Sequence, residues 1–464
     1  MTSAPDLRPA GERRHGPMPV SLAREESPRV VWALAWPVIL ALLSESVVAL
    51  VDMLMVARLG ATAVAAVGVG SQILGAVTLT MTAVATGTIA LVARHVGAGA
   101  RDEASQTLAQ SMIAGAALGA VMVVPVVLWA EPIVLAFGVT PEVAEVGARF
   151  VRFVMLSVPS SAVLFVFGSG LRASGDTRTP LVIGIFVNVL NVAGNWLLIF
   201  GHLGFPALGV AGSAVATAFA YTSGVAFACL LLVRGRLRLR PRRADFRPRG
   251  DVIRRVLRVG YPAGIEQALM QLGFLLYLVF AARYGTDAIA AYFIGVRILM
   301  LSFLPGFGFA AASSTLVGQH LGAGNPARAE SAGWRSTCMS VVMMSTSGLV
   351  IFLLAEPIAH LFVDEPPVVS GAVAFIHMLA ISQPFMAMDF TLGGALRGAG
   401  DTRFPLVSVL IAFYVVRLGT SFVVAGILHL PLVWLWGTII GDYIVRAALK
   451  SWRFRQGVWR TIQV

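Results

Sequence analysis

The chain has 464 residues, 57% of them hydrophobic and only 12% charged, with a formal net charge of +12. An ordinary soluble domain has about 25% charged residues, so this composition excludes a soluble globular protein. Apolar stretches of about 20 residues, enough to cross a ~30 Å hydrocarbon core, fill most of the chain instead. The only cysteines, Cys229 and Cys338, stand in apolar runs. They exclude a disulfide framework, and we expect both to be buried and unreactive.

The chain begins with a polar, proline-containing segment, residues 1–29, which has no apolar core. It is therefore not a signal peptide, and we expect a disordered cytoplasmic tail. Twelve apolar spans follow and predict an all-α integral membrane protein. The predicted spans are residues 30–57, 62–92, 105–129, 142–168, 180–200, 208–233, 255–282, 287–317, 331–354, 368–394, 405–427 and 432–452.

Arginine is concentrated in the loops on one side of these spans. The connection from Arg234 to Arg258 carries eleven arginines and two aspartates. Arginine excess near span ends marks the cytoplasmic side, and an even number of spans puts both termini there. We therefore expect a basic cytoplasmic linker over residues 234–254 and a cytoplasmic tail over 456–464. Contact with membrane lipids that have anionic headgroups explains this charge, and we expect no nucleic acid partner.

A repeat divides the chain into two six-span halves, residues 30–233 and 255–455. The stretch from Pro37 to Pro180 recurs 225 positions later without a gap. The run Ala-Glu-Pro-Ile, for example, stands at 130–133 and again at 355–358. Because each copy has an even number of spans, both copies have the same orientation. We expect two homologous six-helix bundles related by a pseudo-twofold axis normal to the membrane.

Polar side chains inside the first half are candidates for cation or proton coupling. Glu45 and Asp52 are two turns apart on one face of the first span, and a carboxylate at the bilayer centre costs about 3 kcal/mol. Asn188, Asn191 and Asn195 form one stripe on the fifth span, and Asn195 matches the depth of Asp52. Oxygen ligands suit a hard cation such as sodium, whereas a carboxylate alone suits a proton. Alternatively, the asparagines only join helices by hydrogen bonds.

The second half carries its acids at other positions of the repeat. Glu266, with Gln267 beside it, lies in the seventh span and Asp389 in the tenth, and neither has an acid at the equivalent position of the first half. With Arg297, these residues are candidates for binding a cationic substrate. Alternatively, Arg297 or Arg417 pairs with one of these acids, and the ion pair only locks helices together.

The loops after the second and fourth spans of each half are also repeated. They read Arg-His-Val-Gly-Ala-Gly at 94–99, Gln-His-Leu-Gly-Ala-Gly at 319–324, and Leu-Arg-x-x-Gly-Asp-Thr-Arg at both 171–178 and 396–403. They lack the lysine and the strand–loop–helix context of a nucleotide site. Glycines end one helix, and Thr179 is expected to cap the next. We assign a structural or gating role to these loops through Arg94, Arg172, Asp176, Arg397 and Asp401.

Together these residues resemble the multidrug and toxic compound extrusion (MATE) family. Trp-Pro-Val-Ile-Leu at 36–40 and Val-Asp-Met-Leu-Met-Val-Ala at 51–57 resemble its first helix, with Asp52 at the acidic position, and residues 191–201 resemble its fifth. The resemblance implies an antiporter of the bacterial inner membrane, without a cofactor, that exchanges amphipathic, often cationic compounds for sodium ions or protons. It also implies two bundles in a V that opens alternately to each side. We expect a monomer.

The chain departs from the family pattern at its acidic positions. One branch has an aspartate where this chain has Asn195. The norfloxacin-exporter branch has a glutamate at the position of Met270 and an aspartate near Met386, each about one turn from Glu266 or Asp389. Sodium and proton therefore both stay open as the coupling ion.

Two other functions compete with drug export. A flippase for a lipid or lipid-linked saccharide of the same superfamily needs a long hydrophilic, often cationic cleft, and the few arginines inside the spans argue against one. An intramembrane enzyme needs a catalytic set near a membrane face. The seven histidines are scattered without metal-ligand spacing. We expect a transporter rather than an enzyme, and no metal site.

Overall fold

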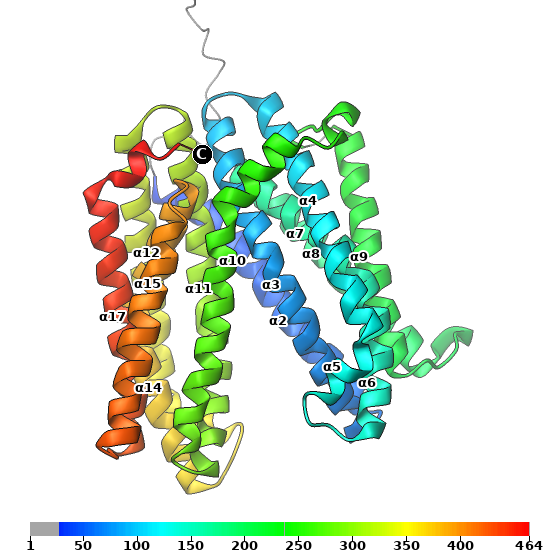
Figure 1. The fold of residues 1–464 in the computed structure, drawn as a ribbon, viewed down its shortest axis with the longest axis vertical. Helices are drawn as coiled ribbons and strands as arrows, with labels where there is room; N and C mark the ends of the chain where they lie inside the picture. The colour runs from blue at the N-terminus through cyan, green and yellow to red at the C-terminus, as the bar shows by residue number, and fades with distance from the viewer. Residues whose placement is uncertain (1–26, 236, 464) are drawn as a thin grey trace, which may run out of the picture.

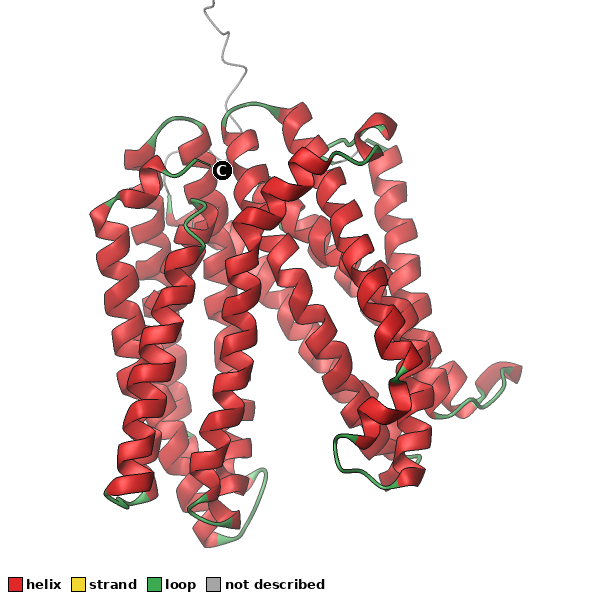
Figure 2. Ribbon diagram, viewed as in Figure 1, coloured by secondary structure: helices red, strands yellow, loops and turns green. Residues whose placement is uncertain are grey.

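A computed structural model describes residues 27–235 and 237–463 of the chain. Within these ranges, twelve helical segments are long and apolar enough to cross a membrane. The predicted count and the all-α fold are therefore confirmed, and every described element in Figure 2 is a helix or a loop. Residues 1–26 of the predicted tail lie outside the described residues.

The first half contains six spans and one short helix between the third and fourth. The helices are α2 (Pro28–Ala57), α3 (Ala61–Gly97), α4 (Arg101–Leu128), α5 (Ala130–Leu135), α6 (Pro141–Val154), α7 (Val158–Ala173), α8 (Arg178–Phe200) and α9 (Val210–Val233). A 3-10 turn joins α6 and α7 into one span. Asp176, rather than Thr179, caps α8, because its carboxylate accepts hydrogen bonds from the backbone nitrogen (3.0 Å) and hydroxyl (2.7 Å) of Thr179.

The second half repeats this order, including the short helix. Its helices are α10 (Gly250–Ala282), α11 (Thr286–Gly322), α12 (Pro326–Leu353), α13 (Ala355–His360), α14 (Pro366–Gly398), α15 (Arg403–Val409), α16 (Gly419–Phe422) and α17 (Leu432–Gln456). The repeated Ala-Glu-Pro-Ile runs begin α5 and α13, so equal sequence forms equal structure. The eleventh span differs from α8, because residues 410–418 and 423–427 are π-helical.

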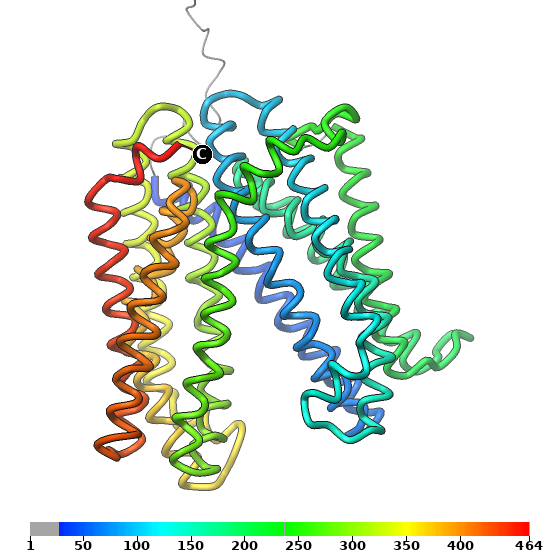
Figure 3. Tube along the Cα trace, viewed as in Figure 1, coloured from blue at the N-terminus to red at the C-terminus, as the bar shows by residue number. Residues whose placement is uncertain are grey.

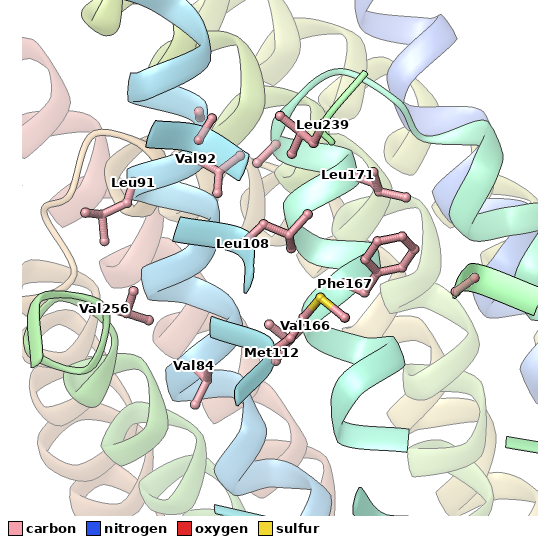
Figure 4. Packing of buried hydrophobic residues seen from close by; sticks show 14 of the residues in the cluster. Val84, Leu91, Val92, Leu108, Met112, Val166, Phe167, Leu171, Leu239 and Val256 are labelled. Carbon is pink, nitrogen blue, oxygen red and sulfur yellow. The ribbon is translucent and has the colours of Figure 1, made fainter. Parts of the chain in front are cut away.

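The two bundles meet at one end and diverge toward the other (Figure 1). We call the end that carries residues 237–249 the linker end, and the opposite end the far end. The first helix of each half starts at the linker end against the other half (Figure 3). Leu34 of α2 packs with Phe309 of α11, and Val256 of α10 packs with Val84 and Leu91 of α3 (Figure 4).

Two glycines allow the helices of the two halves to approach each other closely at these crossings. A Cβ on Gly260 of α10 would collide with the carbonyl group of Ala83, and a Cβ on Gly308 of α11 would come into very tight contact with the carbonyl oxygen of Ala35. Ala35 and Ala83 stand 225 positions before Gly260 and Gly308 respectively. The two contacts are therefore equivalent under the repeat, as a pseudo-twofold axis between the bundles requires.

The linker folds onto the first half instead of standing free of it. Leu237 and Leu239 are buried in the first half's core, and Figure 4 shows Leu239 close to Leu108 and Leu171. The buried amide of Gln110 on α4 contacts the backbone of Asp245 (2.5 Å), Arg247 (2.8 Å) and Arg249 (2.7 Å). The signal for this packing was the alternation of leucine and arginine over 237–240, which gives an extended segment one apolar face.

The expectation that both cysteines are buried is wrong. Cys229 and Cys338 are exposed on the protein surface, because each lies on the outward face of a spanning helix, where lipid replaces protein as the apolar surroundings. The C-terminal segment folds back after α17. The ring of Trp459 is buried and stacks on Phe454 at 4.7 Å, while its Nε1 donates to the Phe454 carbonyl at 2.7 Å.

Candidate functional site

The first half places Asp52 among neutral amides, as the matching depths predicted. Asn195 of α8 donates from Nδ2 to Oδ1 of Asp52 on α2 at 2.6 Å. With the Asn191 amide oriented so that its oxygen accepts from Thr217 Oγ1 at 3.0 Å, its nitrogen lies 2.9 and 3.1 Å from the two Asp52 oxygens. The carboxylate is therefore held by two hydrogen-bond donors that carry no charge.

Asn195 is fully buried, and its Oδ1 has no hydrogen-bond donor among the described residues. A buried acceptor without a donor costs free energy, about 1–3 kcal/mol, unless another group compensates it. This oxygen belongs to the same amide that binds Asp52. The set therefore combines a carboxylate, two amides and the Thr217 hydroxyl, which are ligand types that a hard cation prefers.

A cavity of about 290 Å³ opens beside this set. Glu45, Asp52, Asn188 and Asn191 line one part of it. The rest of its wall is mostly apolar and includes Val48, Met53, Val67, Leu74, Phe150 and Val154. Such a mixture of a few polar groups and a broad apolar surface is typical of sites for small organic molecules, although this volume is at the lower end of their range, roughly 300–1,000 Å³.

Not every predicted member of the coupling set contacts Asp52. Asn188 donates instead to Ser44 Oγ at 2.9 Å, one residue from Glu45. Three further residues of α9 line the cavity, Ser213, Thr217 and Tyr221, and none of them was predicted from the sequence. Their spacing of four placed them on one helical face, but hydroxyl groups in an apolar helix give a weak signal because they often bond to their own backbone.

The second half holds its acids in a buried network of charges. Lys450 of α17 binds Asp389 of α14 at 2.5 Å, and Arg446 lies 4.0 Å from the same carboxylate. Arg446 also binds Asp442 through two hydrogen bonds, at 2.6 and 3.1 Å. Arg417 completes the network, 3.6 Å from Asp442. All five side chains are at most 4% exposed.

The Arg417 guanidinium lies between aromatic rings, 4.1 Å from the ring centre of Tyr277 and 4.9 Å from that of Phe413. Cation–π contacts of this kind compensate part of the lost hydration of a buried cation. Arg417 lies in the π-helical segment 410–418. The sequence signal for the network was present but unused: Asp442, Arg446 and Lys450 recur every fourth residue, on one face of the twelfth span.

Glu266 also has a different partner from the one expected. It binds Arg397 at 2.7 Å, whereas Arg297 is exposed and Gln267 half-buried, and neither has a hydrogen bond to Glu266 or Asp389. The expected pairing with Arg297 or Arg417 is therefore wrong. Arg297 is exposed and Arg417 pairs with Asp442 at 3.6 Å, whereas Arg397 at the end of α14 reaches Glu266.

Arg397 has its repeat equivalent in Arg172, at the end of α7. Arg172 lies near Glu45 of α2 without a direct ion pair to it among the described residues, and its Nη2 donates to Ser169 Oγ at 2.7 Å. Each half thus sets an acid of its first helix near the arginine that ends its fourth span. The two acids looked unrelated in sequence because they stand about one turn apart in the repeat.

Polar contacts across the two halves gather at the linker end. Gln319 of α11 donates to the carbonyl of Ala173 at 2.8 Å, and Thr315 donates to that of Arg172 at 3.0 Å. In the opposite direction, Arg94 of α3 donates to the carbonyl of Ala399 at 2.8 Å. Arg94 and Gln319 are equivalent under the repeat, so each half closes on the end of the other half's fourth span.

The two loop aspartates act locally. Asp176 caps α8, and its equivalent Asp401 accepts from the backbone nitrogen of Phe404 at 3.4 Å. Asp401 additionally binds Arg453 of α17 at 2.8 Å. These carboxylates therefore fix the loops on which the cross-half contacts depend, without crossing between the halves themselves.

Comparison with known proteins gives a consistent result. The MatE family profile matches residues 37–197 and 262–423, one match in each half. A probable multidrug resistance protein NorM of Mesorhizobium japonicum is 30% identical over 94% of this chain and 95% of its own length. The corresponding protein of Thermotoga maritima is 29% identical, over 86% and 85%.

Solved structures share the fold at lower identity. An outward-facing multidrug resistance MATE family transporter of the MOP superfamily superposes with a TM-score of 0.85 at 21% identity, covering 97% of this chain and all of its own. A MOP superfamily transporter from Pyrococcus furiosus, described as having a binding pocket of reverse polarity, gives 0.87 at 21% identity with the same coverage.

Proposed function

Because the chain belongs to the MatE family, we propose that it is a secondary active antiporter that exports amphipathic, often cationic compounds in exchange for sodium ions or protons. The observation that carries this proposal is Asp52, a carboxylate inside a spanning helix whose hydrogen-bond donors are the neutral amides of Asn191 and Asn195. A charged group in such a place is costly and marks an ion pathway by default.

The amides of Asn191 and Asn195 can bind either the Asp52 carboxylate or a cation. In the structure they donate N–H groups to the carboxylate. Rotation of an amide by half a turn about its last side-chain bond presents its oxygen instead, so that Asp52, Asn191, Asn195 and Thr217 can surround a sodium ion. Alternatively, a proton on Asp52 removes the charge that the N–H groups stabilise. Either event changes the contacts between α2 and α8. The arrangement of these two helices therefore depends on whether the site holds a cation or proton.

The adjoining cavity supplies a place for the exported compound. Its apolar wall suits an amphipathic body, and Glu45 and Asp52 suit a positive charge. Since the cation site and the cavity share Asp52, binding of the coupling ion opposes binding of a cationic compound. Competition for one carboxylate is a direct physical basis for exchange.

We assign the linker end to the cytoplasm of a bacterial inner membrane, with both termini on that side and the protein acting as a monomer. Support comes from the arginine-rich linker. In this orientation the contacts of Arg94, Thr315 and Gln319 close the cytoplasmic side, and the bundles diverge toward the outside. Export then requires these contacts to break so that the cavity can load from the cytoplasm.

The acids of the second half are assigned to the scaffold. Glu266 and Asp389 already have cationic partners at 2.7 and 2.5 Å. A cationic substrate would have to displace a fixed guanidinium or ammonium group from each.

The test uses the purified full chain in liposomes with proton and sodium gradients imposed separately. Several cationic dyes, a neutral dye of similar size and a fluorescent lipid are offered as cargo. We expect cationic dyes to be transported against their gradient under one of the two ion gradients. Lipid translocation without dye transport would show that the protein is a flippase and not an exporter. Dye movement that depends on neither gradient would contradict the antiport mechanism.

A further inference from the structure

The first third of α10 has two opposite faces at the linker end. Val256, Val259 and Gly260 are buried against α3 of the other half. On the opposite face, Arg254, Leu257, Arg258 and Tyr261 are all exposed and follow helical spacing. Together with Gly250 and Ile253 they line a shallow, wide-open groove on the surface of α10.

The groove has two cations over an apolar floor. No hydrogen bond or ion pair joins Arg254 or Arg258 to any described residue, and both arginines line the groove together with Leu257 and Tyr261. A second surface groove, between α14 and α17, has only Arg455, which lies over the Trp334 ring at 5.4 Å. The α10 groove therefore differs in offering two positive charges that have no partner within the described chain.

The position of the groove along the membrane normal matches that of lipid phosphates. The 33 residues of α10 span roughly 50 Å at 1.5 Å per residue, about 20 Å more than the ~30 Å hydrocarbon core. The turns that carry Arg254 and Arg258 therefore lie in the headgroup region. Tyr261, about 10 Å along the helix from Arg254, lies near the boundary of the hydrocarbon core, where aromatic side chains gather.

We propose that this groove binds one anionic phospholipid. Its phosphate lies between Arg254 and Arg258, and an acyl chain lies along Leu257 and Tyr261. Two unpaired arginines select a net negative headgroup over a zwitterionic one, and the apolar floor selects a lipid over a free phosphate ester.

The site also has a consequence for the conformational cycle, which rests on the proposed function. The groove lies on the face of α10 opposite to the face that packs against α3, where the two halves meet. A lipid held there fixes the linker-end part of α10, so it favours the closed contact between the halves. The matching face of α2 carries Arg29, Trp32, Ala33 and Trp36 at the equivalent positions, with a single arginine, and does not repeat the site.

Native mass spectrometry of the full chain in detergent tests the proposal. It resolves the first bound lipid, and the probes are dioleoyl phosphatidylglycerol, dioleoyl phosphatidylcholine and glycerol 3-phosphate. We expect phosphatidylglycerol to bind more tightly than phosphatidylcholine. R254A and R258A should each weaken phosphatidylglycerol binding about fivefold, the effect of about one charge near a membrane surface, and leave phosphatidylcholine binding unchanged.

The matched control is R101A/R328A, which removes two exposed arginines from the linker ends of α4 and α12. It should bind phosphatidylglycerol as the natural chain does. The proposal fails if R254A/R258A keeps full affinity, if the control loses as much, or if glycerol 3-phosphate displaces the lipid. Melting temperatures in lipid-free detergent show whether each variant is folded, and the single variants supply the same test if the double variant is not. Lipid binding does not require transport, so this result is independent of the exporter assignment.

Discussion

In the first half the carboxylate of Asp52 is held by the amides of Asn191 and Asn195, whereas in the second half Asp389 and Asp442 are held by Lys450 and Arg446. Neutral donors leave the negative charge of Asp52 available to a mobile cation. Cationic partners cancel the charge of the second pair, and in a buried position their attraction is strong. One scaffold therefore carries an exchangeable acid in one half and fixed acids in the other.

The largest expected effect comes from breaking the fixed pair. K450M leaves Asp389 buried with only Arg446, 4.0 Å away, and should destabilise the protein by about 3 kcal/mol. D389L/K450M should recover most of that loss, because Leu164 fills the equivalent position of the first half. Melting temperature, measured beside dye affinity, separates stability from binding. A K450M protein as stable as the natural chain, or a selective loss of cationic dye binding, would contradict a scaffold role.

Much of this comparison could be predicted from sequence, and the missing part has a physical cause. The pairing of Asp52 with Asn195 followed from counting residues to the span ends, since helical rise is constant. The partners of Glu266 and Asp389 could not be found in this way. Their contacts depend on rotation and on which side chain reaches furthest, and the π-helical segment at 410–418 shifts the rotational position of Arg417.

The second largest effect is expected within the first half, where Asn195 contacts Asp52 and Asn188 does not. N195A removes a donor to Asp52 and a potential oxygen ligand, so the cation concentration for half-maximal export should rise about tenfold, the equivalent of roughly 1.4 kcal/mol. N188A on the same helix is the matched control for the cation dependence: Asn188 lines the cavity but bonds to Ser44 rather than to Asp52, so this variant should leave the half-maximal cation concentration unchanged. Equal effects of the two variants would show that the asparagines act only as links between helices.

A smaller effect is expected at the linker end. Q319A and R94A each remove one cross-half hydrogen bond, worth about 1 kcal/mol, and should shift the closed-to-open ratio about fivefold. Distances between spin labels at positions 101 and 328, after Cys229 and Cys338 are changed to serine, report the two populations by electron–electron resonance. Unchanged distance distributions in both variants would remove these residues from the gate.

The most direct measurement of the central claim is gradient-driven dye accumulation in liposomes by D52N and by D389L/K450M, compared at equal amounts of folded protein. D52N replaces a carboxylate by an amide at a position whose hydrogen-bond partners are uncharged, so the variant should insert into the membrane normally. We predict that D52N loses accumulation under either ion gradient but still exchanges dye for dye, whereas D389L/K450M keeps accumulation. Near-normal accumulation by D52N, or its selective loss in D389L/K450M, would contradict the assignment of ion coupling to the first half.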